Sequence, residues 1–139
     1  MSRLNAFIRR WGVAIFMMVV IFVFSSLPSS ELPNFNWADW IVKKGGHALG
    51  YGLLAFTYLR GLKGESSHTS SRQLLGAWLL AVLYSATDEF HQSFTPGRHP
   101  AATDVLIDSI GAAIALILAV RYYRRKMTGH TDRSLNTDT

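Results

Sequence analysis

The feature that most constrains this chain is the gathering of its apolar residues into four long blocks, separated by polar stretches that contain glycine and proline. The blocks cover about residues 11–27, 45–62, 74–90 and 105–123. Each is close to the ~17–25 residues that a helix needs to cross the ~30 Å hydrocarbon core of a bilayer. In addition, 49% of the residues are hydrophobic and only 17% are charged, against roughly 25% in soluble domains. The pattern predicts an all-α integral membrane protein, a compact bundle of four transmembrane helices formed by residues 1–126.

The orientation of these helices is predicted from the basic residues between them, because cytoplasmic loops carry the excess of Lys and Arg. If both termini and the middle loop are cytoplasmic, most basic residues lie inside, namely Arg3, Arg9, Arg10, Arg60, Lys63, Arg72, Arg121, Arg124, Arg125, Lys126 and Arg133. Lys43, Lys44 and Arg98 then lie outside. We therefore expect an N-in, C-in protein. Residues 127–139 are polar and lack a periodic apolar pattern, which predicts a disordered cytoplasmic tail.

Composition excludes several classes of function. The formal charge is +5, but the basic residues lie at helix ends and in the tail, without the interleaved aromatic residues of a nucleic-acid-binding face. We therefore expect the lipid bilayer, and no nucleic acid, as a partner. The chain has no cysteine, which excludes disulfides, thiolate metal sites and cysteine nucleophiles.

Three short stretches bring ionisable residues to the predicted outer side. In the first, Lys44, His47 and Tyr51 are three and four residues apart and therefore share one helix face. Gly46 and Gly50 in the same stretch form a GxxxG pair, which predicts close approach of another backbone.

The second stretch closes the third apolar block. Asp88, His91 and Gln92 are neighbours on one helix face, because they are three and four residues apart. Glu89 points about 100° away from Asp88 at ~3.6 residues per turn. We therefore expect the two acids to have different partners.

The third stretch is residues 94–98, followed by acids on the fourth helix. Its Pro-Gly pair suits a type II turn, since glycine accepts the positive φ that such a turn requires. The turn would swing Arg98 back over the helix ends. Asp104 and Asp108 share a face with Gly111, where a small residue permits close packing.

Charged groups at membrane depth need partners or water, because each costs roughly 2.5–3.5 kcal/mol at a helix centre. The stretches therefore predict a charge-paired, partly hydrated pocket. Structural interpretations stay open: Lys44 as a snorkelling residue, His47 with Tyr51 as a packing pair, and Glu89 as a solvated helix end. A structural ion-pair network is the alternative for the remaining charged residues, namely Asp88, Arg98, Asp104 and Asp108.

At these residues the chain resembles the VanZ-like family of small bacterial membrane proteins. The matching features are Asp39 with Lys44 and His47-xxx-Tyr51, Asp88-Glu89-x-x-Gln92-x-Phe94 with Pro96-Gly-Arg98, and Asp104 followed by Asp108 and Gly111. Many members have asparagine at the position of Asp108. The resemblance implies a multi-pass protein of the bacterial plasma membrane that acts on the cell envelope. The family's name comes from a protein associated with low-level resistance to teicoplanin rather than vancomycin.

Two functions fit the predicted pocket. In the first, the protein binds or modifies an anionic envelope component, a lipid-linked precursor or a lipoglycopeptide at the outer leaflet. Arg98 and Lys44 would hold the anion and the acids would orient these bases. The candidate ligand-binding residues are Lys44, His47, Tyr51, Asp88, Glu89, Gln92, Arg98, Asp104 and Asp108.

The second function is a membrane hydrolase or transferase that acts on a lipid phosphate. His47 or His91 would be the general acid/base, Asp88 would orient it, and Arg98 would stabilise charge on the phosphate. A divalent metal held by Asp88, His91 and Asp104 is a variant of this hypothesis, although the chain has no HExxH motif. We therefore assign no metal site and no cofactor. A transporter is disfavoured, since the four blocks show no internal repeat.

Overall fold

The computed structural model describes the backbone of residues 3–28, 30, 36–66 and 68–135, and it is helical. The helices are α1 (Arg3–Ser26), the short 3-10 helix η2 (Asn36–Ala38), α2 (Asp39–Lys63), α3 (Ser71–Gln92) and α4 (Ala102–Leu135). Within these residues there is no strand. The prediction of an all-α chain with four long helices is therefore confirmed.

The helices are longer than the predicted apolar blocks. α1 begins at Arg3 rather than near residue 11, and α2 begins at Asp39 rather than near residue 45. α4 continues to Leu135, so residues 127–135 of the predicted disordered tail are helical, and residues 136–139 lie outside the described residues. The reason is that a helix satisfies its own backbone hydrogen bonds and can continue into polar sequence. The apolar block marks only the part suited to hydrocarbon.

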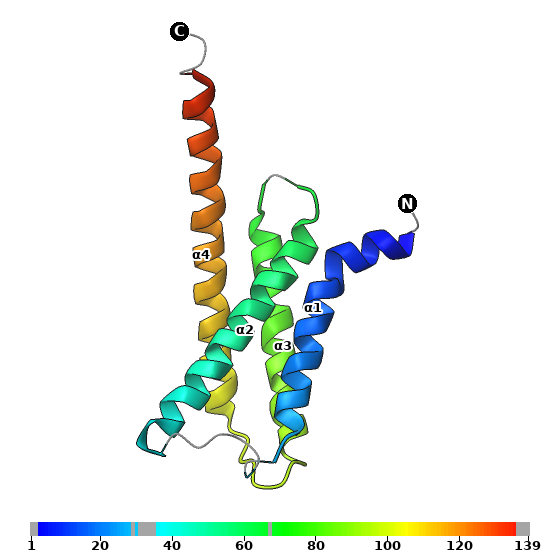
Figure 1. The fold of residues 1–139 in the computed structure, drawn as a ribbon, viewed down its shortest axis with the longest axis vertical. Coiled ribbons are helices and arrows are strands. Elements are labelled where there is room, and N and C mark those ends of the chain that lie inside the picture. The colour runs from blue at the N-terminus through cyan, green and yellow to red at the C-terminus, as the bar shows by residue number, and fades with distance from the viewer. Residues whose placement is uncertain (1–2, 29, 31–35, 67, 136–139) are drawn as a thin grey trace.

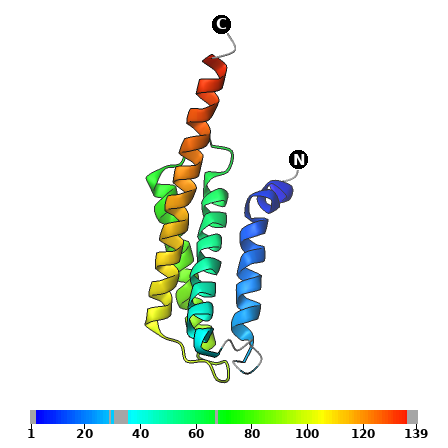
Figure 2. The ribbon, with the colours of Figure 1, turned by 60° about the vertical axis from the view of Figure 1, so that its left-hand side comes forward.

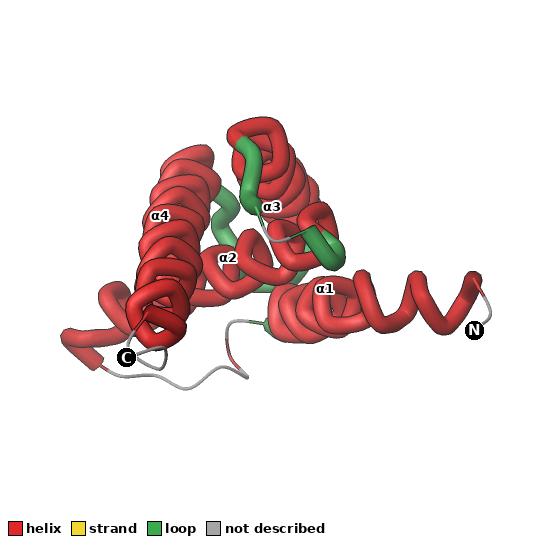
Figure 3. Tube along the Cα trace, turned by 90° about the horizontal axis from the view of Figure 1, so that it is seen from above, coloured by secondary structure: helices red, strands yellow, loops and turns green. Residues whose placement is uncertain are grey.

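The four long helices lie side by side with alternating direction (Figure 1, Figure 2). At one end, here called the site end, α1 and α3 finish and α2 and α4 begin. At the other, the terminal end, lie the start of α1, the connection between α2 and α3, and the last turns of α4, which project beyond the bundle. Viewed along the bundle, α2 lies among the other three helices (Figure 3), and it contacts each of them.

Small residues allow α2 and α4 to pack closely. A Cβ atom on Gly111 would lie 2.8 Å from Ala48 Cα, and one on Gly52 would lie 3.1 Å from the carbonyl oxygen of Gly111. The close packing expected at Gly111 is thus confirmed. The close backbone approach expected at Gly46 and Gly50 is wrong, because a Cβ atom at either position would meet nothing within 4 Å.

The surface of the bundle is apolar. Large hydrophobic side chains are exposed on every long helix, including Phe16, Leu49, Leu83 and Leu118, each more than half exposed. α1 and residues Ala102–Arg125 of α4 are long and apolar enough to cross a membrane. Among the described residues, α2 and α3 are not apolar enough by the same measure, because glycine, tyrosine and charged residues interrupt them. That all four helices cross a membrane therefore stays a prediction. An apolar surface of this extent indicates contact with lipid.

Candidate functional site

Three carboxylate side chains are buried at the site end. Asp88 and Glu89 on α3 are 4% and 6% exposed, and Asp108 on α4 is 1% exposed. Acidic residues are almost never buried to this extent without partners. Their partners therefore define the site.

Asp88 is held by two neutral donors. Ser25 Oγ donates to its Oδ2 at 2.7 Å, and Gln92 Nε2 donates to the same oxygen at 2.9 Å. The bond between Asp88 and Gln92 confirms that they share a helix face. The bond from Ser25 joins α3 to the end of α1.

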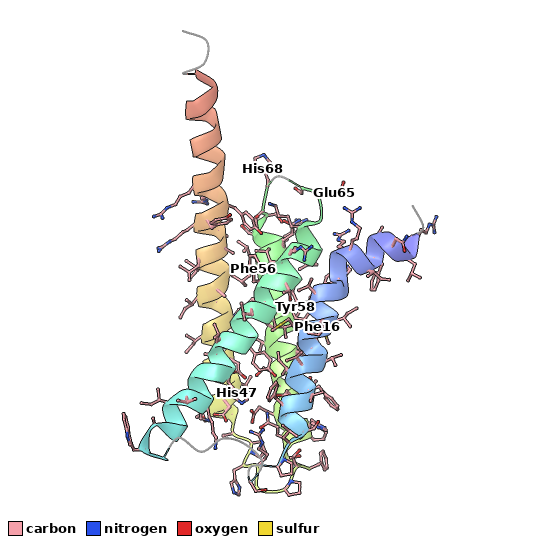
Figure 4. All side chains as sticks on the ribbon, viewed as in Figure 1. Phe16, His47, Phe56, Tyr58, Glu65 and His68 are labelled. Atoms are coloured by element: carbon pink, nitrogen blue, oxygen red, sulfur yellow. The ribbon has the colours of Figure 1, made fainter. Side chains whose placement is uncertain are left out.

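Asp108 lies between α3 and α2. Ser85 Oγ donates to its Oδ2 at 2.6 Å. Its Oδ1 lies 3.7 Å from Nδ1 of His47, an ion-pair separation that is longer than a hydrogen bond. The ring of His47 stacks on that of Tyr51 with centroids 6.4 Å apart, as their spacing predicts. Figure 4 places His47 on α2 at the site end, beside the start of α4.

Glu89 and Asp104 have separate partners. Oε2 of Glu89 accepts a hydrogen bond at 3.0 Å from the backbone N–H of Ala101, which comes just before α4. Glu89 and Asp88 thus differ in their partners, as expected. Asp104 forms an ion pair with Lys44 across α2 and α4. The structural interpretation of Asp104 as part of an ion pair thus fits the geometry, but its partner is Lys44, for which the structural interpretation was a snorkelling residue.

Arg98 contacts the end of α1. Gly97 has φ +71°, and the backbone N–H of Arg98 donates to Thr95 O at 3.2 Å, which confirms the predicted turn. The guanidinium donates to Phe24 O at 2.9 Å and to Leu27 O at 3.3 Å. Arg98 therefore caps the last turn of α1, where the carbonyl group of Phe24 has no intrahelical partner.

His91 faces α1. Its Nε2 lies 3.1 Å from Ser26 Oγ, and its ring centroid is 4.6 Å from that of Phe22. The hypothetical metal ligands Asp88, His91 and Asp104 therefore turn to three different sets of partners. Across the described residues, no group of three or more His, Asp or Glu side chains is placed to hold a metal ion.

A cavity of about 440 Å³ lies between α1 and α2 at the site end. One wall is apolar and consists mainly of α1 side chains. The lining residues are Met17, Val20, Ile21, Phe24, Ser25, Val42, Lys43, Gly46, His47, Gly50, Tyr51 and Arg98. Gly46 and Gly50 thus border open space instead of another helix.

Several buried polar atoms at the site end have no hydrogen-bond partner within the described chain, and two of their residues, His47 and Tyr51, line the cavity. The atoms are His47 Nδ1, Tyr51 OH, Asp88 Oδ1, Glu89 Oε1 and Asp108 Oδ1. Buried polar groups are normally satisfied, so these atoms retain the capacity to bind water or a ligand. The cavity thus combines an apolar wall with a few polar side chains, among them His47 and Tyr51.

Comparison with protein-family models gives a match to VanZ/LLP1 over residues 10–123. The matched range includes most of the chain. The chain belongs to the VanZ/LLP1 family. No curated protein and no solved structure matches it.

The VanZ/LLP1 range contains every site residue predicted from the sequence. The prediction missed the contribution of α1, which supplies Ser25 to Asp88 and most of the apolar cavity wall. The signal available was weak: Ser25 and Ser26 end the first apolar block. Hydroxyl groups there could have suggested partners for the acids of the third helix.

Proposed function

We propose that this VanZ/LLP1 protein binds an anionic, lipid-linked envelope component in the cavity between α1 and α2. In this proposal all four long helices cross the bacterial plasma membrane. Both termini are cytoplasmic and the site end faces outward. The excess of basic residues at the terminal end and the apolar surface of the bundle support this topology.

The observation that carries the proposal is the chemistry of the cavity. Met17, Val20 and Ile21 offer an apolar wall to a hydrocarbon chain. Lys43 and Arg98 line the same cavity and favour a phosphate or carboxylate. A ligand with a hydrocarbon tail and an anionic head matches both parts.

The proposed roles of the basic residues differ from those expected from sequence. Lys44 forms an ion pair with Asp104 and does not line the cavity, whereas Lys43 does line it, so Lys43 is the lysine proposed beside the ligand. Arg98 is fixed by the carbonyl groups of Phe24 in α1 and of Leu27 just after it, which orients its guanidinium in advance of binding. His47 and Tyr51 would contact polar groups of the ligand, and the buried acids would orient these two side chains.

Filling the cavity should abolish binding. Gly46→Leu adds a side chain to open space in the cavity lining. Gly45→Leu is the matched control, because a Cβ atom at Gly45 also meets nothing within 4 Å but Gly45 does not line the cavity. With undecaprenyl phosphate as the probe, native mass spectrometry of the purified protein should show binding to wild type and Gly45→Leu only.

Equal binding of undecaprenyl phosphate by the two leucine variants would show that the ligand does not bind in this cavity. The second measurement is antibiotic susceptibility of a Gram-positive host that expresses each protein at matched abundance. Wild type and Gly45→Leu should shift susceptibility to teicoplanin but not to vancomycin, and Gly46→Leu should not. If Gly46→Leu still shifts teicoplanin susceptibility, resistance does not depend on binding in this cavity.

A hydrolase is the second candidate, favoured by the position of His47 against buried Asp108. A carboxylate near Nδ1 orients a histidine so that Nε2 is available as a general base, as in acyl-transfer triads. Asp108 thus takes the role that the sequence suggested for Asp88. Release of phosphate from undecaprenyl diphosphate by wild type, lost in His47→Gln with binding retained, would support catalysis. Binding without release would support the binding protein alone.

A further inference from the structure

A second cavity, of about 780 Å³, lies at the terminal end between the first turns of α1 and the end of α2. Its lining residues include Arg9, Arg10, Arg60 and Glu65. Figure 4 shows Glu65 at this end, opposite the end that carries His47. This cavity is therefore separate from the proposed ligand site.

The architecture of α1 creates the cavity. The first turns of α1 bend away from the bundle in all three ribbon and tube views (Figures 1–3). At the bend, Arg10 donates to Gly61 O and, at 3.1 Å, to Leu62 O, and so caps α2. Trp11 packs so closely on Gly61 that a Cβ atom there would lie 2.8 Å from the indole ring. One guanidinium of the cavity is therefore fixed by the fold.

The other two guanidinium groups are available. Arg9 and Arg60 are exposed, and within the described residues neither forms a hydrogen bond or an ion pair. Glu65 is also exposed and forms no ion pair there. The three arginines exceed the single glutamate in charge, so the cavity attracts anions. Guanidinium groups bind phosphate oxygens through paired N–H donors.

The bent segment would bring this cavity to the depth of lipid headgroups. Leu4, Phe7 and Ile8 are each more than half exposed, and their spacing places them on one helix face. An amphipathic segment of this kind lies in the membrane interface with its apolar face toward the acyl chains. Arg9 then lies where phosphate groups of lipids are concentrated.

We propose that this cavity binds the phosphate group of an anionic phospholipid at the terminal end of the bundle. The apolar face of the bent segment holds the acyl chains beside it. Arg9 and Arg60 contact the phosphate, while Arg10 maintains the helix ends that form the cavity. This site does not depend on the ligand proposed for the site end. Free phosphate shares the same recognition chemistry.

The test is the binding of phosphatidylglycerol to the purified full-length protein in detergent, followed by native mass spectrometry and thermal unfolding. The variant Arg9→Gln/Arg60→Gln removes the two unpaired arginines and leaves the cap of Arg10 intact. The control Arg3→Gln/Arg72→Gln removes the same charge from exposed positions at the same end, outside the cavity. Phosphatidylcholine and inorganic phosphate are tested in parallel.

We expect apparent affinity for phosphatidylglycerol to fall about ten-fold or more in the cavity variant and to change little in the control. The same variant dependence with inorganic phosphate alone would support the anion site and assign it to free phosphate. An equal loss in both variants would overturn the proposal, since any arginine at that end would then suffice. Equal binding of phosphatidylcholine and phosphatidylglycerol would overturn it as well.

Discussion

At the scale of single residues, the buried acids are each satisfied on one oxygen only. Asp88 and Asp108 accept hydrogen bonds from serine or glutamine on one oxygen. Their second oxygens form no hydrogen bond within the described chain, although Oδ1 of Asp108 lies at ion-pair separation from His47. Arginine and lysine, the expected partners, bind other groups: Arg98 binds backbone carbonyl groups at the end of α1, and Lys44 binds Asp104. Neutral donors orient the acids without consuming the capacity to bind a ligand. Such an arrangement suits a binding site better than a purely structural ion-pair network.

Ser85→Ala should destabilise the protein, because it removes the donor to buried Asp108. Hydrogen bonds between helices in membranes contribute about 0.6 kcal/mol on average, and an unsatisfied buried group costs about 1–3 kcal/mol. We expect a loss of about 1 kcal/mol in the free energy of unfolding. Thermal unfolding in detergent should show a midpoint lower by a few degrees.

Thr87→Ala provides the control for this measurement. Thr87 is on the same helix, but it is exposed and its hydroxyl donates only to Tyr84 O. The unfolding midpoint of Thr87→Ala should match that of the wild-type protein. If Ser85→Ala also unfolds at the wild-type midpoint, the hydroxyl of Ser85 does not stabilise Asp108.

At the scale of elements, two arginines cap helices to which they do not belong. Arg98 caps α1 at the site end, and Arg10 caps α2 at the terminal end. A positive charge near a helix C-terminus also interacts favourably with the helix dipole. Arg10 thereby joins the first part of α1 to the end of α2, and Arg98 joins the end of α1 to the connection between α3 and α4. The space between α1 and α2 at the site end remains a cavity.

Gly111→Ala should disrupt the contact between α2 and α4. The added Cβ atom would lie 2.8 Å from Ala48 Cα, and a helix backbone cannot move aside as a flexible side chain can. Overpacking typically costs about 1–3 kcal/mol, and contact with backbone places this change at the upper end. The expected result is a marked loss of folded protein, measured by size-exclusion chromatography and thermal unfolding.

Gly45→Ala serves as the comparison within the same helix pair. A Cβ atom at Gly45 meets nothing within 4 Å, so alanine should be neutral or stabilise α2 by about 0.5–1 kcal/mol. If both alanine variants unfold at the same temperature, the helices are not held together at Gly111.

At the scale of the whole molecule, polarity is distributed inversely to that of a water-soluble bundle. Large apolar side chains cover the outside, whereas Asp88, Glu89 and Asp108 are buried within. Basic residues gather at the terminal end, where the three arginines of the second cavity lie. The two cavities therefore occupy opposite ends of the bundle, which corresponds to opposite leaflets in the proposed topology.

The topology predicts which connections are accessible from outside the cell. The chain has no native cysteine, so a single introduced thiol is a clean probe. Ser93→Cys, just after α3, should react with a membrane-impermeant maleimide in intact cells. Ser66→Cys, between α2 and α3, should react only after the membrane is permeabilised. Reaction of both in intact cells would mean that α3 does not cross the membrane.

Patterns among residues close together in the sequence predicted much of the fold and part of the site. Four apolar blocks predicted four helices, since their length and hydropathy are properties of consecutive residues. Helical periodicity placed Asp88 beside Gln92 and His47 beside Tyr51, and Pro-Gly chemistry predicted the turn before Arg98. In each case the interacting residues are within a few positions of one another.

The tertiary structure decided the rest, because the rotation of each helix about its axis depends on distant contacts. Periodicity showed that Gly46 and Gly50 share a face, but only packing placed that face on a cavity and Gly111 against α2. The partner of Arg98 likewise depends on where α1 ends, more than seventy residues earlier in the chain. Sequence alone thus determined the helices and the polar residues at one end of the bundle, and only the packing of α1 turned those residues into a cavity.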